Sequence, residues 1–322
     1  MQENEKITKR RFFKKIFGLL SAYIGFYMGK DGFLSNAVTI SKEEQSIPEM
    51  PMIQFGRYKI SKLIIGGNPI SGNSHLSDET DQTMLDYCSE ENVINLLHIC
   101  EERGINTWQA RGDRHIISLL LAYGNKGGNL HWIAQTASEL ADIPRNIRDI
   151  AMTGAIGTYH HGSKTDELWN NGKIDEVNKM LKVIRDTGVM VGLGSHIPEV
   201  LEYAEEKNWD LDFYMACFYN PLKKKGQIDE KTGKQFQGEY YGDEDRERMC
   251  KFIKQTNKIC FGFKILAASR KCATPESTKE AFEYALKNIK KNDAIVVGMF
   301  LPYHAVDDTR YVKEIWNEIS KS

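Results

Sequence analysis

The chain has 322 residues, of which 43 are Lys or Arg and 44 are Asp or Glu, and its formal net charge at pH 7 is −1. No basic stripe interleaved with aromatic residues follows the amino-terminal segment. This argues against nucleic-acid binding, because such proteins need clustered positive charge to meet a phosphate backbone. A small molecule is therefore the expected partner of the chain.

The first 37 residues have the pattern of an export signal. Arg10 and Arg11 precede an apolar stretch over residues 16–28 that is too short to span a bilayer comfortably. Residues 35–37 offer a small-x-small cleavage site. The segment resembles the twin-arginine signal of bacteria. The resemblance implies recognition by the export machinery and a place in the periplasm or cell envelope, with the membrane contacted only through this segment. A general secretory signal or an uncleaved anchor is the alternative.

A linker and a hairpin are expected next. Residues 38–51 are polar, contain two prolines and show no sustained period, which is typical of a linker. Residues 52–60 alternate around Gly56, which predicts a short hairpin.

Eight short apolar runs follow, and a stretch of helical periodicity separates each run from the next. The runs cover residues 62–69, 105–113, 130–137, 155–162, 189–196, 213–221, 260–268 and 294–302. Strands that alternate with helices in this way indicate parallel βα units. Eight such units predict an α/β protein with one (β/α)8 TIM barrel over residues 52–322, whose amino-terminal mouth the hairpin would close.

Polar residues end nearly every one of these runs. In a parallel barrel the active site is built at the carboxyl ends of the strands, so we expect these side chains to share one cavity. With His75, which follows the first run, the candidate site residues are Asn68, Arg111, Asp113, Gln135, His161, His196, Tyr219, Asn220 and Lys264.

Three of these residues are expected to be catalytic, and each has a side-chain nitrogen that can bind and release a proton. Lys264 stands in an otherwise apolar run, where an ammonium without a partner would cost several kcal/mol. It therefore has a partner or a role, such as a Schiff base, a proton relay or the binding of an anion. His161 and His196 end neighbouring strands and are suited to proton transfer. The sequence leaves open whether His160 or His161 faces the barrel.

Asp113 is the fourth expected catalytic residue. Alternation along the strand places it on the same face as Arg111. The alternative is that the two residues only pair with each other or cap the next helix. If a divalent metal is present, His161, His196 and Asp113 would be its ligands, although ligands from separate strands leave no local spacing to support a metal.

The remaining candidates are expected to bind substrate. Amide side chains suit a ligand rich in hydroxyl groups, and Arg111 would anchor a carboxylate or phosphate. The expected substrate-binding residues are Asn68, Arg111, Gln135, Tyr219, Asn220 and His75.

Two further features carry expectations about structure. Six cysteines show no CxxC pair, which favours buried thiols over a metal site or a disulfide. Residues 222–239 form an unusually long stretch after the sixth run, and we expect either a lid that carries Tyr240 and Tyr241 or a solvated loop.

Three stretches resemble the aldo-keto reductases. Residues 55–67 are similar to that family's opening hairpin and first strand, residues 102–108 to its approach to the second strand, and residues 294–298 to its last strand. The resemblance implies a barrel that uses NAD(P) and an Asp-Tyr-Lys-His set. In this chain Gln109 stands in place of the aspartate and Gln135 in place of the lysine, and no tyrosine follows Gln109 within several residues.

These departures shape the functional hypothesis. Our main prediction is an exported enzyme that acts on a small carbohydrate-derived or carbonyl compound by proton transfer, as an isomerase, lyase or hydrolase. One alternative is an NAD(P)-linked oxidoreductase of aldo-keto reductase type with an altered active site, in which Ser269 and Arg270 receive a nucleotide phosphate. The other alternative is a sugar-binding barrel without catalysis.

Overall fold

The computed structural model of the protein describes residues 48–228 and 235–321. The predicted export signal over residues 1–37 and most of the predicted linker lie outside the described residues. Within the described part of the chain, no helix combines the length and the apolar character that a bilayer span requires.

Eight parallel strands form a closed barrel, as the recurring apolar runs predict. Each run contributes one strand, and the strands follow one another around the barrel in sequence order until Val296 of the last strand pairs with Ile64 of the first. The strands are β3 (Leu63–Gly66), β4 (Thr107–Arg111), β5 (His131–Gln135), β6 (Gly157–His160), β7 (Met190–Ser195), β8 (Phe213–Cys217), β9 (Ile259–Phe263) and β10 (Ala294–Gly298).

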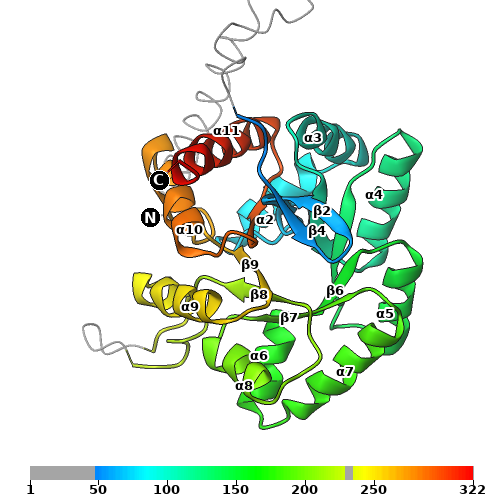
Figure 1. The fold of residues 1–322 in the computed structure, drawn as a ribbon, viewed down its shortest axis with the longest axis vertical. Helices are drawn as coiled ribbons and strands as arrows, with labels where there is room; N and C mark the ends of the chain where they lie inside the picture. Colours follow the sequence, from blue (N-terminus) through cyan, green and yellow to red (C-terminus); the bar gives the residue numbers. More distant parts are fainter. Residues whose placement is uncertain (1–47, 229–234, 322) are drawn as a thin grey trace, which may run out of the picture. The chain divides into compact units, whose positions relative to one another are not determined.

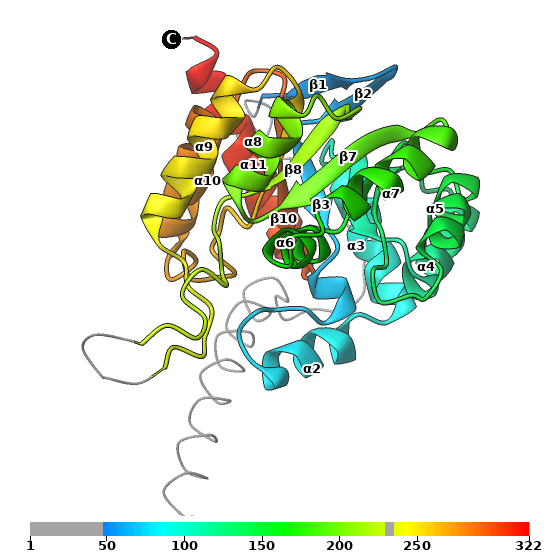
Figure 2. The same ribbon diagram turned by 90° about the horizontal axis from the view of Figure 1, so that it is seen from below.

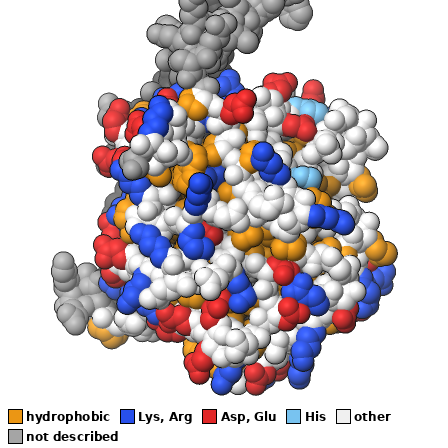
Figure 3. All heavy atoms as spheres, viewed as in Figure 1, with side chains coloured by type: hydrophobic (Ala, Val, Ile, Leu, Met, Phe, Trp, Pro, Cys, Tyr) orange, Lys and Arg blue, Asp and Glu red, His pale blue; other side chains and the backbone are white. Residues whose placement is uncertain are grey.

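Helices surround the barrel (Figure 1). Each packs an apolar face on the strands and leaves charged residues outside, and basic and acidic side chains are interspersed on the face in Figure 3. Short helices η2 (Pro69–Ser71) and α2 (Asp78–Tyr87) follow β3. The outer helices are α3 (Glu90–Glu102), α4 (Arg114–Asn125), α5 (Ile143–Met152), α6 (Gly162–Asn170), α7 (Asp175–Asp186), α8 (Pro198–Glu206), α9 (Asp243–Gln255), α10 (Pro275–Asn288) and α11 (Pro302–Ile319).

The predicted hairpin closes the amino-terminal end of the barrel. Strands β1 (Met52–Phe55) and β2 (Tyr58–Ser61) are antiparallel, and Gly56 at the turn has the left-handed φ of 57° that glycine adopts without strain. The Phe55 ring packs against Phe213 and Phe261 inside the barrel, with ring centroids 5.2 and 5.3 Å apart. Figure 2 shows the hairpin and α2 at opposite ends of the barrel.

A buried lysine links the start of the barrel to the turn that precedes its last strand. Nζ of Lys62 donates to the carbonyl oxygens of Lys291 at 3.0 Å and Asp293 at 2.8 Å, and it lies 3.7 Å from the centroid of the Trp316 ring. Burial lowers the pKa of Lys62 to about 7, although nearby Asp293 partly offsets this. The apolar run that begins at Lys62 thus starts with an amine whose hydrogen bonds are made inside the protein.

All six cysteines are free thiols. Five are buried, as expected for core thiols, and Cys272 is exposed.

Candidate active site

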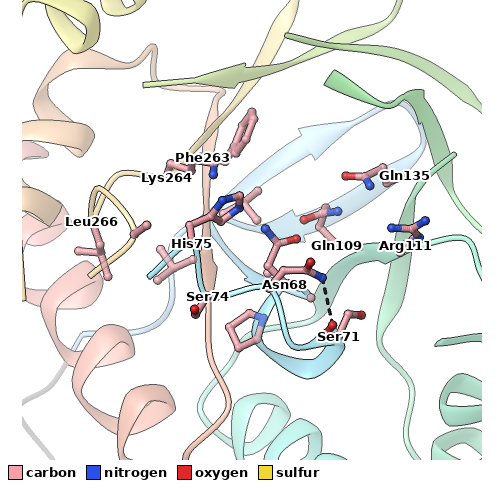
Figure 4. Close-up of a pocket in the computed structure, with 18 of the residues that line it drawn as sticks. Asn68, Ser71, Ser74, His75, Gln109, Arg111, Gln135, Phe263, Lys264 and Leu266 are labelled. Atoms are coloured by element: carbon pink, nitrogen blue, oxygen red, sulfur yellow. Dashed lines mark hydrogen bonds between the residues drawn. The ribbon is translucent and has the colours of Figure 1, made fainter. Parts of the chain in front are cut away.

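A cavity of about 350 Å³ opens at the carboxyl ends of the barrel strands. Seven of the ten predicted site residues line it, together with several that the sequence did not single out. Lys264 and His75 lie across the cavity from the ends of β4 and β5, which carry Gln109, Arg111 and Gln135 (Figure 4). The predicted residues that line the cavity are Asn68, His75, Arg111, Gln135, His161, His196 and Lys264.

Three predicted site residues lie outside the cavity lining. Asp113 caps α4, because its Oδ1 accepts from the backbone N–H of Ile116 at 2.9 Å. Tyr219 is buried, with its ring 5.4 Å from that of Tyr241. Asn220 is held through its backbone N–H, which donates to Asp245.

Arg111 lines the cavity but is engaged by two carboxylates. Its Nε lies 3.3 Å from Oδ2 of Asp113, and its Nη2 forms an ion pair with Glu139. Both partners come from the loops that follow β4 and β5. The guanidinium charge is therefore balanced within the protein, which weakens the expected anchoring of an anionic substrate by Arg111.

The structure decides between the two adjacent histidines. His161 lines the cavity, and its Nδ1 is 2.7 Å from Oγ of Ser138. His160 faces the other way, where its Nδ1 is 2.7 Å from Oγ1 of Thr165 on α6. Burial, followed by the nearby charges of His196 and Arg111, lowers the pKa of His161 to about 4. His161 is thus neutral at physiological pH.

His196 is held by an aspartate that sequence reasoning missed. Its Nδ1 lies 2.7 Å from Oδ2 of Asp166 on α6, and Oδ1 of Asp166 accepts from Oγ of Ser195 at 2.5 Å. Burial opposes a charge on the imidazole, but neighbouring Cys217 and the bond to Asp166 outweigh it and raise the pKa of His196 to about 10. The two cavity histidines therefore differ in charge at neutral pH.

Tyr159 is a second cavity residue that the sequence did not single out. It sits on β6 directly opposite Gln135 of β5. Its hydroxyl accepts from Nε2 of Gln109 and donates to Oε1 of Gln135, both at 2.9 Å. Tyr159 thus joins the two amides that stand where the family resemblance would place an aspartate and a lysine. Alternation from His161 would have placed it on the inner face.

Lys264 has an uncommon backbone conformation. Its φ is 58°, and Ala267, Ala268 and Ser269 further along the same turn are also left-handed. Such conformations are unfavourable for residues other than glycine and cluster at ligand sites. Burial lowers the pKa of Lys264, while neighbouring Cys217 and Glu239 act in the opposite direction.

The end of the long loop after β8 reaches the cavity rim. Oε1 of Glu239 is 2.9 Å from Nδ1 of His75, and Tyr241 donates to Oε2 of Glu239 at 2.6 Å. Although burial opposes ionisation, the bonds to His75 and Tyr241 lower the pKa of Glu239 to about 2. The residues of the predicted lid that lie nearest the barrel therefore contact the cavity wall.

The described residues do not gather a metal site. Among residues 48–228 and 235–321, no group of three or more His, Cys, Asp or Glu side chains is placed to hold an ion. Two of the expected ligands are already engaged. Asp113 caps α4, and Nδ1 of His196 is bonded to Asp166.

Comparison with known proteins identifies the fold. No family model and no curated protein matches the sequence. The glycerol dehydrogenase AKR11B4 from Gluconobacter oxydans matches in structure with 12% identity and a TM-score of 0.50, over 84% of this chain and 95% of that chain. The aldo-keto reductase AKR11C1 from Bacillus halodurans, in its holo form, matches with 13% identity and a TM-score of 0.53, over 85% of this chain and 96% of that chain. The chain thus has the barrel fold of the aldo-keto reductases.

This result corrects the main functional prediction. We expected an isomerase, lyase or hydrolase, but the structural neighbours are oxidoreductases. The prediction of proton-transfer chemistry alone is therefore wrong. We also expected NAD(P) to be less likely than a divalent metal, and the similarity to aldo-keto reductases makes NAD(P) the cofactor to test. The oxidoreductase alternative is the better supported reading of the chain.

Proposed function

We propose that the protein is an NAD(P)-linked oxidoreductase that interconverts a small hydroxylated carbonyl compound and its alcohol, with an altered set of catalytic residues. The observation that carries this proposal is the cavity at the carboxyl end of an aldo-keto reductase barrel, into which three successive strand ends bring Gln109, Gln135 and His161. The wall is rich in hydrogen-bonding groups, which suits a hydroxylated ligand.

The lining residues fit a nicotinamide cofactor. The Phe263 ring offers an aromatic surface for a flat heterocycle, and the amide of Asn68 can pair with a carboxamide. Lys264 and Ser269, in the turn after β9, provide donors for phosphate oxygens. When bound, the reduced nicotinamide would supply a hydride to the substrate carbon.

Arg270, which we expected to receive a phosphate together with Ser269, does not line the cavity. Its guanidinium donates to the carbonyl oxygens of Ala267 and His75, and it lies 4.2 Å from the centroid of the Tyr241 ring. It joins the turn after β9 to the segment after η2 and to the end of the long loop. Of the expected Ser269 and Arg270 pair, only Ser269 lines the cavity.

The substrate would be oriented by neutral groups. Nδ1 of His161 is occupied by Ser138, which leaves Nε2 for a ligand. Tyr159 fixes Gln109 and Gln135 through its hydroxyl, so their remaining amide groups keep defined directions toward substrate hydroxyls. Preorganised donors of this kind bind without the entropy loss of ordering flexible side chains.

Cofactor binding and turnover test this proposal directly. We expect purified protein to quench or shift NADH or NADPH fluorescence on titration, and to oxidise the cofactor at 340 nm when glyceraldehyde or dihydroxyacetone is added. Phe263→Ala should weaken cofactor binding, whereas Phe236→Ala, an aromatic change in the long loop that is absent from the cavity lining, should not. Failure to bind either cofactor, with none released on denaturation, would refute the proposal. Sugar binding without any turnover would instead favour the non-catalytic barrel.

Export with the cofactor already bound is part of the same proposal. Its support is the sequence pattern of residues 1–37, because twin-arginine export carries folded proteins. A tightly bound nicotinamide would then function where the free cofactor is not maintained.

A further inference from the structure

We propose that His196, positioned by Asp166, is the group that gives a proton to the substrate oxygen in the proposed reduction. This inference rests on the proposed function, and it assigns the step for which the chain lacks the family's tyrosine and lysine. In the reduction, the carbonyl carbon takes the hydride and the two π electrons move to the oxygen. The oxygen then takes the proton from Nε2 of His196, and the electron pair of that N–H bond stays on the imidazole until solvent restores the proton.

The geometry of His196 supports this role. The residue lines the cavity, directly after β7, and its side chain is 14% exposed, so it is both shielded and reachable. Asp166 occupies Nδ1 at 2.7 Å, which fixes the ring. The Cys217 side chain also forms a hydrogen bond with the imidazole, so a substrate oxygen would replace Cys217 as the acceptor from Nε2. An aspartate that holds an imidazole in this way is the arrangement that stabilises an imidazolium in hydrolase triads.

Asp166 is itself firmly held. Its Oδ1 accepts from Oγ of Ser195, and its Oδ2 also accepts from the backbone N–H of His196 at 3.2 Å. Its side chain is 11% exposed. A buried carboxylate needs such donors to stay charged. The network therefore holds a carboxylate beside the imidazole of His196. Asp166 is thus a positioning residue.

The surroundings of His196 separate it from His161. Asp166 faces it from α6, Cys217 from the end of β8 and His161 from the end of β6, and the Phe263 ring on β9 lies 5.5 Å away. The carboxylate favours a charged His196, while the charge on His196 helps to keep His161 neutral. Two neighbouring groups whose pKa values are driven apart commonly divide acid and hydrogen-bonding roles.

The test combines kinetics with the charge state of the ring. His196→Gln should lower kcat for NAD(P)H-dependent reduction of glyceraldehyde by about 10²- to 10⁴-fold, the usual contribution of a general acid, while the Kd for NAD(P)H changes by less than about threefold. His160→Gln is the matched control, since His160 is also buried but faces Thr165 and does not line the cavity. It should leave kcat near the wild-type value.

Asp166→Asn tests the positioning role. Removing the carboxylate lowers the pKa of His196, so the alkaline fall in kcat should move to lower pH in this variant. Imidazole ¹⁵N NMR of the full chain should show His196 doubly protonated at pH 7.5 in the wild type and neutral in Asp166→Asn. A merely structural role would lower activity without moving the pH profile.

Two outcomes would overturn the inference. One is a His196→Gln protein that still reduces glyceraldehyde within about threefold of the wild-type kcat. The other is a neutral His196 at pH 7.5 in the wild type. NMR detects this charge state even in a protein that shows no turnover. Failure of the proposed function is a different result, because it appears as a wild-type protein that does not bind NADH or NADPH at all.

Discussion

The hydroxyl of Tyr159 donates a hydrogen bond to Oε1 of Gln135 across 2.9 Å, inside the cavity at the carboxyl end of the barrel. The same hydroxyl accepts from Gln109. One phenol thereby holds two amides whose positions the aldo-keto reductase resemblance gives to charged residues. The site therefore has a neutral hydrogen-bonded chain at these two positions.

Replacing Tyr159 with Phe should therefore affect both stability and substrate binding. Each amide would lose a buried partner, and the free energy of unfolding should fall by about 1–3 kcal/mol. KM for a hydroxylated substrate should rise, because Gln109 and Gln135 would no longer be fixed. Urea denaturation and steady-state kinetics measure the two effects. Tyr203→Phe, on α8 outside the barrel, is the control, and equal effects in both variants would contradict the assignment.

Asp113→Ala should destabilise the protein without abolishing activity. Loss of an aspartate N-cap typically costs about 0.5–2 kcal/mol, and Asp142→Ala, which removes the cap of α5, should cost a similar amount. Thermal denaturation of both variants checks this. A complete loss of turnover in Asp113→Ala at unchanged stability would restore the catalytic role that the sequence suggested.

Stability should decrease as the pH falls from about 6.5 toward 4. Burial, as the largest cause, lowers the pKa of His160 to about 3 and that of His161 to about 4. In that range the unfolded chain binds protons that the folded chain does not, so each histidine removes up to about 1.4 kcal/mol per pH unit. Urea denaturation at several pH values should show this slope. His160→Gln should reduce the slope, and the change His115→Gln at an exposed site should not.

Lys62→Met should destabilise the protein by roughly 1–3 kcal/mol. The carbonyl oxygens of Lys291 and Asp293 would lose their buried donor, although the apolar replacement retains some contact with Trp316. Lys59→Met, at an exposed position of β2, serves as the comparison. If both variants unfold at the same urea concentration, the internal hydrogen bonds of Lys62 contribute nothing.

Replacing Arg10 and Arg11 with Lys should retain the protein in the cytoplasm. Twin-arginine recognition depends on the arginine pair, whereas a general secretory signal needs only positive charge. Fractionation of bacteria that express the wild-type and doubly substituted chains measures the exported share. Equal export of both chains would point to the general pathway.

The barrel could be predicted from sequence because its rule is local. An apolar run, a helical stretch and a polar strand end recur eight times, and each repeat can be recognised without knowledge of the others. The predicted runs extend beyond the observed strands, chiefly at their carboxyl ends, as at Cys217 and Phe263, where the chain leaves the barrel and turns. Local patterns indicate which residues are apolar but do not determine where the ladder of hydrogen bonds stops.

The site residues that sequence analysis missed can be recognised only from contacts between segments that are distant in the chain. Asp166 lies on a helix, 30 residues before the histidine that it holds, and nothing in its own neighbourhood marks it. Tyr159 fits an apolar strand as an ordinary core aromatic until Gln109 and Gln135 are placed around it. Asp113 is the opposite case. Its position at a strand end suggested catalysis, but its carboxylate accepts from the backbone N–H of Ile116 and caps α4.

The hairpin at the base of the barrel has a kinetic consequence. Phe55 packs between Phe213 and Phe261 and fills that end of the barrel, so we expect ligands to enter the cavity from the carboxyl side, where Glu239 contacts His75. Two ligands that share a single entrance leave in the reverse of the order in which they arrive. The ligand that binds deeper cannot leave before the outer one, so we expect ordered binding and release.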